Sequence, residues 1–175
     1  MMMTRVRAFF ATSLDGMIAG PEDALDWLPD HGEEEAEDTF TPFFAEIGAM
    51  LMGRRTFEVV KRLGGEWPYG DSPILVATSR ALDAPVPSVR AVHGTIEAMV
   101  EEAREVAGGR DVYLDGGALF RSALEADLID EITMTLVPVV LGEGIRLFSE
   151  GGRRKLTLES ARSIGAGMVQ IRYRV

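Results

Sequence analysis

The stretch Met50-Leu51-Met52-Gly53-Arg54-Arg55-Thr56-Phe57 predicts a buried strand that hands over directly to a helix. The apolar run stops at Gly53, and apolar residues at helical spacing begin with Phe57, Val60 and Leu63. The first N–H groups of a helix lack backbone partners, and the helix dipole favours negative charge at that end. Together with two arginines and a threonine, these groups suit an anionic phosphate. The alternative is a solvated turn whose arginines are only surface residues.

Short apolar runs alternate with helix-like segments on both sides of this stretch. The predicted strands are residues 6–13, 49–52, 74–78, 89–92, 111–115, 131–140, 156–164 and 168–175, and the predicted helices are residues 33–46, 54–63, 96–106 and 118–126. Thr95 is the expected N-cap of the third helix. Pro42 is expected to kink the first helix or to restart it with Thr41 as a new cap.

The order of these elements predicts an α/β fold. Because the early strands alternate with helices, they form a mostly parallel central sheet. The last two strands are joined by Gly165-Ala166-Gly167 without a helix, so they should be antiparallel. With no linker or internal repeat, residues 1–175 are expected to form one domain.

Composition excludes several classes of function. The 175 residues are 46% hydrophobic and contain no apolar run near the roughly 20 residues that span a bilayer. A net charge of −10 disfavours nucleic acid and acidic membranes as partners. The lack of cysteine excludes thiolate chemistry and, with no signal peptide expected, predicts a cytoplasmic protein. His31 and His93 lack the pattern of a metal site.

Three strand ends carry groups that suit an anion. They are Gly53-Arg54-Arg55-Thr56, Thr78-Ser79-Arg80 and Asp115-Gly116-Gly117. In an open α/β sheet, ligands bind beyond the carboxyl ends of the strands, so these loops can share one crevice. Glycine allows a backbone to approach a pyrophosphate closely, and arginine donates charged hydrogen bonds to phosphate. A lone Gly-Gly is as consistent with a tight turn, so the prediction depends on the three loops together.

Motifs along the chain carry a family resemblance. They are residues 10–19 (Phe-Ala-Thr-Ser-Leu-Asp-Gly-Met-Ile-Ala), 52–57 (Met-Gly-Arg-Arg-Thr-Phe), 78–80 (Thr-Ser-Arg) and 114–120 (Leu-Asp-Gly-Gly-Ala-Leu-Phe). In this order they resemble the dihydrofolate reductase superfamily. Residues 137–144 (Val-Pro-Val-Val-Leu-Gly-Glu-Gly) make the chain more similar to the branch with the reductase domain of the bacterial riboflavin-biosynthesis enzyme. The resemblance covers nearly the whole chain and implies a single-domain, three-layer fold that binds NADPH.

The same resemblance assigns cofactor contacts by motif position. Ala11 and Ile18 would flank the nicotinamide, although a core position is equally consistent with Ile18. The implied phosphate contacts are Gly53, Arg54, Arg55 and Thr56, the adenosine-side contacts are Thr78, Ser79 and Arg80, and the pyrophosphate loop is Asp115, Gly116, Gly117, Ala118 and Leu119.

The substrate side has several candidates. Dihydrofolate reductases hold a buried catalytic carboxylate on the helix before the Gly-Arg loop, and Glu37, Asp38 and Asp30 lie near that place. Solvated carboxylates are the alternative, because this segment is acidic throughout. Trp27 is a candidate wall for a planar substrate and Thr135 a candidate polar contact, although each is equally consistent with an ordinary surface or strand position.

These observations predict an NADPH-dependent reductase of a small heterocycle, of pterin or aminopyrimidine type. The implied relatives in activity are dihydrofolate reductase and 5-amino-6-(5-phosphoribosylamino)uracil reductase. The alternative is a dinucleotide-binding module without turnover. NADPH should be preferred over NADH because no acidic residue follows the strand 74–78 to bind a free 2′-hydroxyl. The apolar edge at residues 156–175 and the resemblance together predict a homodimer.

Overall fold

Eight strands form one sheet in the order β5-β4-β3-β6-β1-β7-β10-β9 in the computed structural model, which describes residues 3–29 and 36–175. Strands from β5 to β7 in this order are parallel, whereas β10 and β9 are antiparallel to their neighbours. The strands of this sheet are β1 (Val6–Thr12), β3 (Ile47–Gly53), β4 (Ile74–Ala77), β5 (Val89–Val92), β6 (Asp111–Asp115), β7 (Glu131–Leu136), β9 (Thr157–Gly165) and β10 (Met168–Arg174). The predicted α/β class, with antiparallel C-terminal strands, is confirmed.

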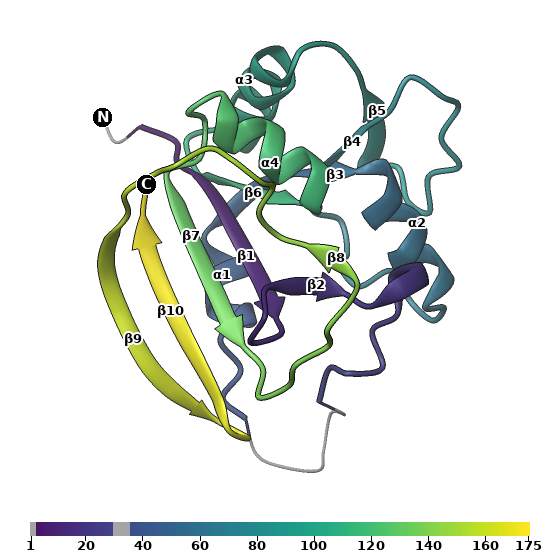
Figure 1. Ribbon diagram of the computed structural model, residues 1–175. Helices are drawn as coiled ribbons and strands as arrows, with labels where there is room; N and C mark the ends of the chain where they lie inside the picture. Colours follow the sequence, from purple (N-terminus) through teal and green to yellow (C-terminus); the bar gives the residue numbers. More distant parts are fainter. Residues whose placement is uncertain (1–2, 30–35) are drawn as a thin grey trace.

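Helices cover both faces of the sheet and make three layers (Figure 1). One face packs against α3 (Ile96–Ala107) and α4 (Gly117–Glu125), and the other against α1 (Phe40–Ala45) and α2 (Arg54–Arg62). Alternation along β1 divides the side chains: Phe10 joins the α3–α4 side, while Phe9 packs on the α1–α2 side. A short 3-10 helix, η1 (Pro21–Asp23), follows β2.

A separate two-stranded ribbon was not predicted from the sequence. It pairs β2 (Met17–Ala19) with β8 (Ile145–Arg146) in antiparallel register. Both strands are too short to show a period, and their pairing spans more than a hundred residues. The ribbon lies beyond the carboxyl end of β1, beside α2 and α4 (Figure 1).

Two predicted elements are shorter in the structure. The helix expected over residues 33–46 is helical only from Phe40, because the Asp38 carboxylate accepts the N–H groups of Phe40 and Thr41. Pro42 therefore lies in the first turn, where its missing N–H has no cost. The strand expected over residues 131–140 ends at Leu136, since Val139 turns away to accept the N–H of Leu14. Residues 33–35 of the predicted helix lie outside the described residues.

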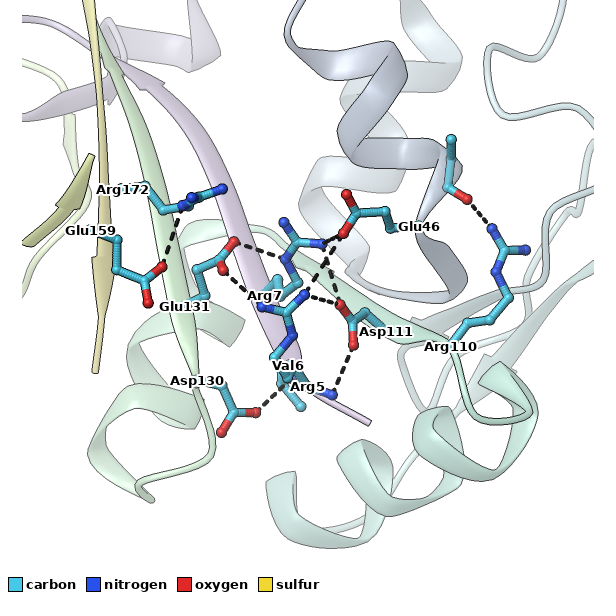
Figure 2. A network of polar contacts seen from close by, with 11 residues as sticks. Arg5, Val6, Arg7, Glu46, Arg110, Asp111, Asp130, Glu131, Glu159 and Arg172 are labelled. Carbon is cyan, nitrogen blue, oxygen red and sulfur yellow. Dashed lines mark hydrogen bonds and ion pairs between the residues drawn. The ribbon is translucent and has the colours of Figure 1, made fainter. Parts of the chain in front are cut away.

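A network of ion pairs closes the amino end of the sheet (Figure 2). Residue Arg7 is 4% exposed, and its Nε lies 2.8 Å from Oε1 of Glu131, a residue that is 3% exposed. Arg7 also reaches Glu46 at 2.7 Å, and Arg5 reaches Asp111 at 2.7 Å and Glu131 at 3.1 Å. Buried charges are tolerated only when paired in this way. These pairs fix α1, β1, β6 and β7 at the end of the sheet opposite the loops described next.

Candidate functional site

A cavity of about 340 Å³ lies at the carboxyl ends of β3 and β6, between α2, α4 and the β2–β8 ribbon. Most of the predicted cofactor residues line it, namely Ile18, Gly53, Arg54, Arg55, Thr56, Asp115, Gly116, Gly117, Ala118 and Leu119. Apolar side chains of Val59 and Val60 in α2, and of Leu63 directly after it, complete one wall. Two of the three predicted loops therefore meet at one site, as expected for a sheet whose strands there are parallel.

The N-termini of two nine-residue helices converge on this cavity. The N-caps of α2 and α4 are Gly53 and Gly116, and neither makes a side-chain capping hydrogen bond. Their first N–H groups are thus available to a ligand, and both dipoles favour negative charge at the same place. The arrangement suits a diphosphate, which presents two linked anionic groups.

Gly116 allows the two loops to touch. Its φ of +118° belongs to a region that other residues rarely adopt. A Cβ at this position would lie 2.9 Å from Thr56 Oγ1 and 3.3 Å from the Gly53 nitrogen. A side chain here would push the two helix ends apart, so glycine is what brings both sets of N–H groups to one ligand.

Three arginines border the cavity, each held by contacts within the protein. Arg54 Nε donates to Glu58 Oε1 at 2.7 Å, and its Nη1 donates to the carbonyl oxygen of Ala81 at 3.0 Å. Arg55 Nε donates to Asp23 Oδ1 at 2.8 Å, and Arg121 Nη1 donates to the Arg146 carbonyl at 2.7 Å. A guanidinium has five N–H donors, so these contacts orient the side chains and leave donors for an anion.

Asp115 is the carboxyl group of the site whose environment is most unusual. It ends β6, lines the cavity and is buried enough to raise its pKa from 3.8 to about 6. Hydrogen bonds from the Gly116 backbone and from Tyr113 favour the ionised form and oppose this shift. Burial raises the pKa of Tyr69, and the negative charge of Asp115 adds to this shift. Sequence reasoning placed Asp115 with the cofactor and missed that it can hold a proton near neutral pH.

The remaining cofactor candidates lie beside the cavity rather than in its lining. Ala11 is partly buried and packs against the cluster of Val137, Ile164 and Met168. Thr78 Oγ1 accepts the Arg80 N–H at 3.2 Å, and Arg54 Nη1 approaches the same oxygen at 3.4 Å. The side chains of Ser79 and Arg80 are exposed on the loop after β4. Their assignment to the adenosine end stays a prediction.

Two of the three expected carboxylate proton donors, Glu37 and Asp38, lie away from the cavity. Glu37 forms a bidentate ion pair with Arg162, which lowers its pKa, and it is half exposed. Hydrogen bonds from Thr41 and Phe40 lower the pKa of Asp38. Neither lines the cavity, and a group with a lowered pKa gives up no proton at neutral pH because it is already ionised. The third candidate, Asp30, lies outside the described residues.

The two substrate candidates lie on the α1 side of the sheet. Trp27 Nε1 donates to the Ala24 carbonyl at 3.0 Å, and its ring packs in a cluster with Val137. Thr135 is 7% exposed and its Oγ1 accepts from Gln170 Nε2 at 3.1 Å. Gln170 also donates to Thr39 at 2.8 Å. Contact of Trp27 or Thr135 with a substrate stays a prediction.

A family model described as the RibD C-terminal domain matches residues 4–170. The chain belongs to this family. Among curated proteins, it is 34% identical to the uncharacterized protein YwjB of Bacillus subtilis (strain 168) over 94% of each chain.

Two solved structures support the fold of this RibD C-terminal domain. A putative riboflavin biosynthesis protein from Shewanella sp. PV-4 has a TM-score of 0.83 at 28% identity, covering 98% of this chain and 99% of the other. Dihydrofolate reductase from Enterococcus faecalis, in a complex with NADP(H), has a TM-score of 0.59 at 18% identity, covering 97% and 95%. The second likeness shows the fold alone, and it confirms the predicted dihydrofolate reductase-like architecture.

In the part of this RibD C-terminal domain that the structure describes, no helix combines the length and the apolar character needed to cross a bilayer. Within residues 3–29 and 36–175, no three histidine, cysteine or carboxylate side chains gather in the way that a metal ion requires.

Proposed function

We propose that this RibD C-terminal domain is an NADPH-dependent reductase of a small heterocycle of pterin or aminopyrimidine type. One observation carries the proposal: two uncapped helix N-termini meet at a single cavity that arginines border. Such a site fits the diphosphate of a dinucleotide. It requires glycine at position 116, because a Cβ there would collide with Thr56 and the Gly53 backbone. Family membership supports the reductase class.

The residues of the cavity divide between binding and positioning. Gly53, Thr56 and Gly117 would offer backbone N–H groups and a hydroxyl to the diphosphate, and Ile18 would press against the nicotinamide. When bound, NADPH supplies the hydride, so the protein has to orient it and exclude water. The apolar lining from Phe10, Leu25 and α2 favours that exclusion.

Asp115 is the group we propose for proton handling at the substrate. Its pKa of about 6 leaves a fraction of the carboxyl protonated at neutral pH, as an acid catalyst needs. It lies at the carboxyl end of β6, next to Gly116, the N-cap of α4. The proposal therefore assigns the acid role to Asp115 in place of Glu37 and Asp38, which lie away from the cavity.

A second candidate function is dinucleotide binding without turnover. It is favoured by the engagement of Glu37 and Asp38, two of the three carboxylates expected to supply a proton, in contacts away from the cavity. The two functions separate in one experiment. Nucleotide fluorescence titration measures NADPH binding, and loss of NADPH absorbance is then followed with pterins, aminopyrimidines and quinones.

Turnover of any compound in this set removes the second candidate. Saturable NADPH binding without turnover by the unmutated protein leaves the binding module, and no NADPH binding overturns both. The Asp115→Asn variant provides the matched test of the acid role, because it should bind NADPH and reduce the same substrate more slowly.

We also propose that the protein is a cytoplasmic homodimer. Strand β9 forms an edge of the sheet, and its residue Leu158 is 56% exposed. Both features support self-association, because an exposed edge strand tends to pair with another chain. The absence of cysteine from the sequence supports a reducing compartment.

A further inference from the structure

Asp15 lies in the turn between β1 and β2 and accepts three hydrogen bonds. Ser13 Oγ donates to Oδ1 at 2.6 Å, and the backbone N–H groups of Leu141 and Gly142 donate at 3.1 and 2.8 Å. The last two donors belong to the segment between β7 and β8, more than a hundred residues along the chain. These hydrogen bonds lower the pKa of Asp15 to about 2, so the carboxylate is ionised at neutral pH.

Further backbone contacts join the two segments that Asp15 connects. Leu14 N–H donates to Val139 O at 2.8 Å, and Leu147 N–H donates to Gly16 O at 3.0 Å. Beyond them, β2 and β8 pair directly. A Cβ on Gly144 would lie 2.2 Å from the Ala19 carbonyl oxygen, which shows how closely the backbones approach. We call residues 13–19 and 137–147 together the flap.

The flap forms one wall of the cavity. Ile18, Ala19 and Ile145 face the cavity, whereas Asp15 does not line it. The Ile18 side chain reaches the start of α4, where its Cδ1 would be 2.6 Å from a Cβ on Gly117. Asp15 therefore acts on the cavity only through the segments that it fastens.

We propose that Asp15 is a positioning residue whose carboxylate fastens the two halves of the flap and so keeps Ile18 and Ile145 closed over the nicotinamide half of bound NADPH. The inference rests on the proposed function, because the ligand is the one proposed there. A wall that must open before a ligand leaves sets its dissociation rate. Loosening the flap should thus speed the loss of NADPH and leave a ligand without a nicotinamide unaffected.

The test compares Asp15→Asn with Asp130→Asn as a matched control. Asp130 also accepts a backbone N–H, from Val6 at 2.7 Å, but lies at the opposite end of the sheet. Stopped-flow displacement gives the NADPH dissociation rate, and titration with adenosine 2′,5′-bisphosphate gives the affinity of a ligand that lacks the nicotinamide. Hydrogen exchange of the unliganded protein, read over residues 13–19 and 137–147, needs no ligand.

For Asp15→Asn we expect hydrogen exchange to rise in both halves of the flap and NADPH to dissociate about tenfold faster, as for loss of a charged hydrogen bond. Affinity for adenosine 2′,5′-bisphosphate should stay within twofold, and Asp130→Asn should change none of the three. Exchange that rises only over residues 13–16, or an unchanged dissociation rate, overturns the inference. Failure of the unmutated protein to bind NADPH would overturn the proposed function instead, and the exchange data would still decide whether Asp15 fastens the flap.

Discussion

Replacing Gly116 with alanine tests the convergence of the two helix ends. The new Cβ would meet Thr56 Oγ1 at 2.9 Å and the Gly53 nitrogen at 3.3 Å, and the backbone would have to keep a φ of +118°. The unfavourable φ costs about 1–3 kcal/mol and the overlap about 1–3 kcal/mol more. We expect Gly116→Ala to lower the free energy of unfolding by about 2–6 kcal/mol.

The variant should also lose its ligand. If the loops move apart to accept the methyl group, the N–H groups of α2 and α4 no longer reach one diphosphate, and the Kd for NADPH should rise at least about tenfold. Urea unfolding measures the first effect and fluorescence titration the second.

Gly109→Ala is the matched control. Gly109 has a φ of +90°, and a Cβ there would have no neighbour within 4 Å. It should cost only the backbone term, about 1–2 kcal/mol, and leave the Kd for NADPH unchanged. If Gly116→Ala matches Gly109→Ala in stability and binds NADPH like the unmutated protein, the proposed contact between the two loops is refuted.

Four further predictions concern other parts of the molecule. Arg80→Ala should reduce the preference for NADPH over NADH by about tenfold in Kd while leaving NADH affinity nearly unchanged, and equal affinities of the unmutated protein for both cofactors would contradict the assignment. Arg7→Ala strips the 3%-exposed Glu131 of its closest partner and should cost about 3–5 kcal/mol in urea unfolding, with no change in NADPH affinity. On the proposed function, kcat/KM of the unmutated protein should fall as pH rises through about 6, and Asp115→Asn should remove that fall. Because the pKa of Asp115 in the folded protein is raised from 3.8, its contribution to stability is present below pH 3.8 and lost as pH rises to about 6. Urea unfolding of the unmutated protein and of Asp115→Asn across this pH window checks the direction of the pKa shift independently of activity. Sedimentation at micromolar concentration should give the mass of a dimer, and a monomer would contradict self-association through the β9 edge.

Local sequence signals predicted most of the fold. The bounds of β5 and β6 match the predicted strands, and Thr95 caps α3 by accepting the Ala98 N–H, as its position before the helix indicated. These elements are set by apolar period and capping chemistry, which a short window of sequence contains. The β2–β8 ribbon was missed because each strand has at most three residues and the partner is distant in the chain.

The candidate site divides in the same way. Glycine and arginine at strand ends predicted the loops around Gly53 and Gly116, because the requirement for backbone N–H groups is local. The environment of Asp115 could not be predicted, since its raised pKa comes from burial created by other elements. Likewise, Glu37 and Asp38 gave no sign in the sequence that Arg162 and the start of α1 would engage them.

Polar groups are paired within the chain at one end of the sheet and left without a capping partner at the other. The first arrangement serves stability and the second serves binding. At the amino end, Arg7 and Glu131 are buried and paired within the chain. At the carboxyl end, the N-caps Gly53 and Gly116 provide no side chain, so helix N–H groups face the cavity without a capping partner. A capping side chain at Gly53, where a Cβ meets no atom closer than 3.9 Å, would stabilise α2 by about a few tenths of a kcal/mol, yet it would occupy the place of the anion. Thus Gly53→Ser should bind NADPH more weakly even where it unfolds at higher urea concentration. Stability and affinity should change in opposite directions because the capping side chain and the ligand compete for the same helix N–H groups.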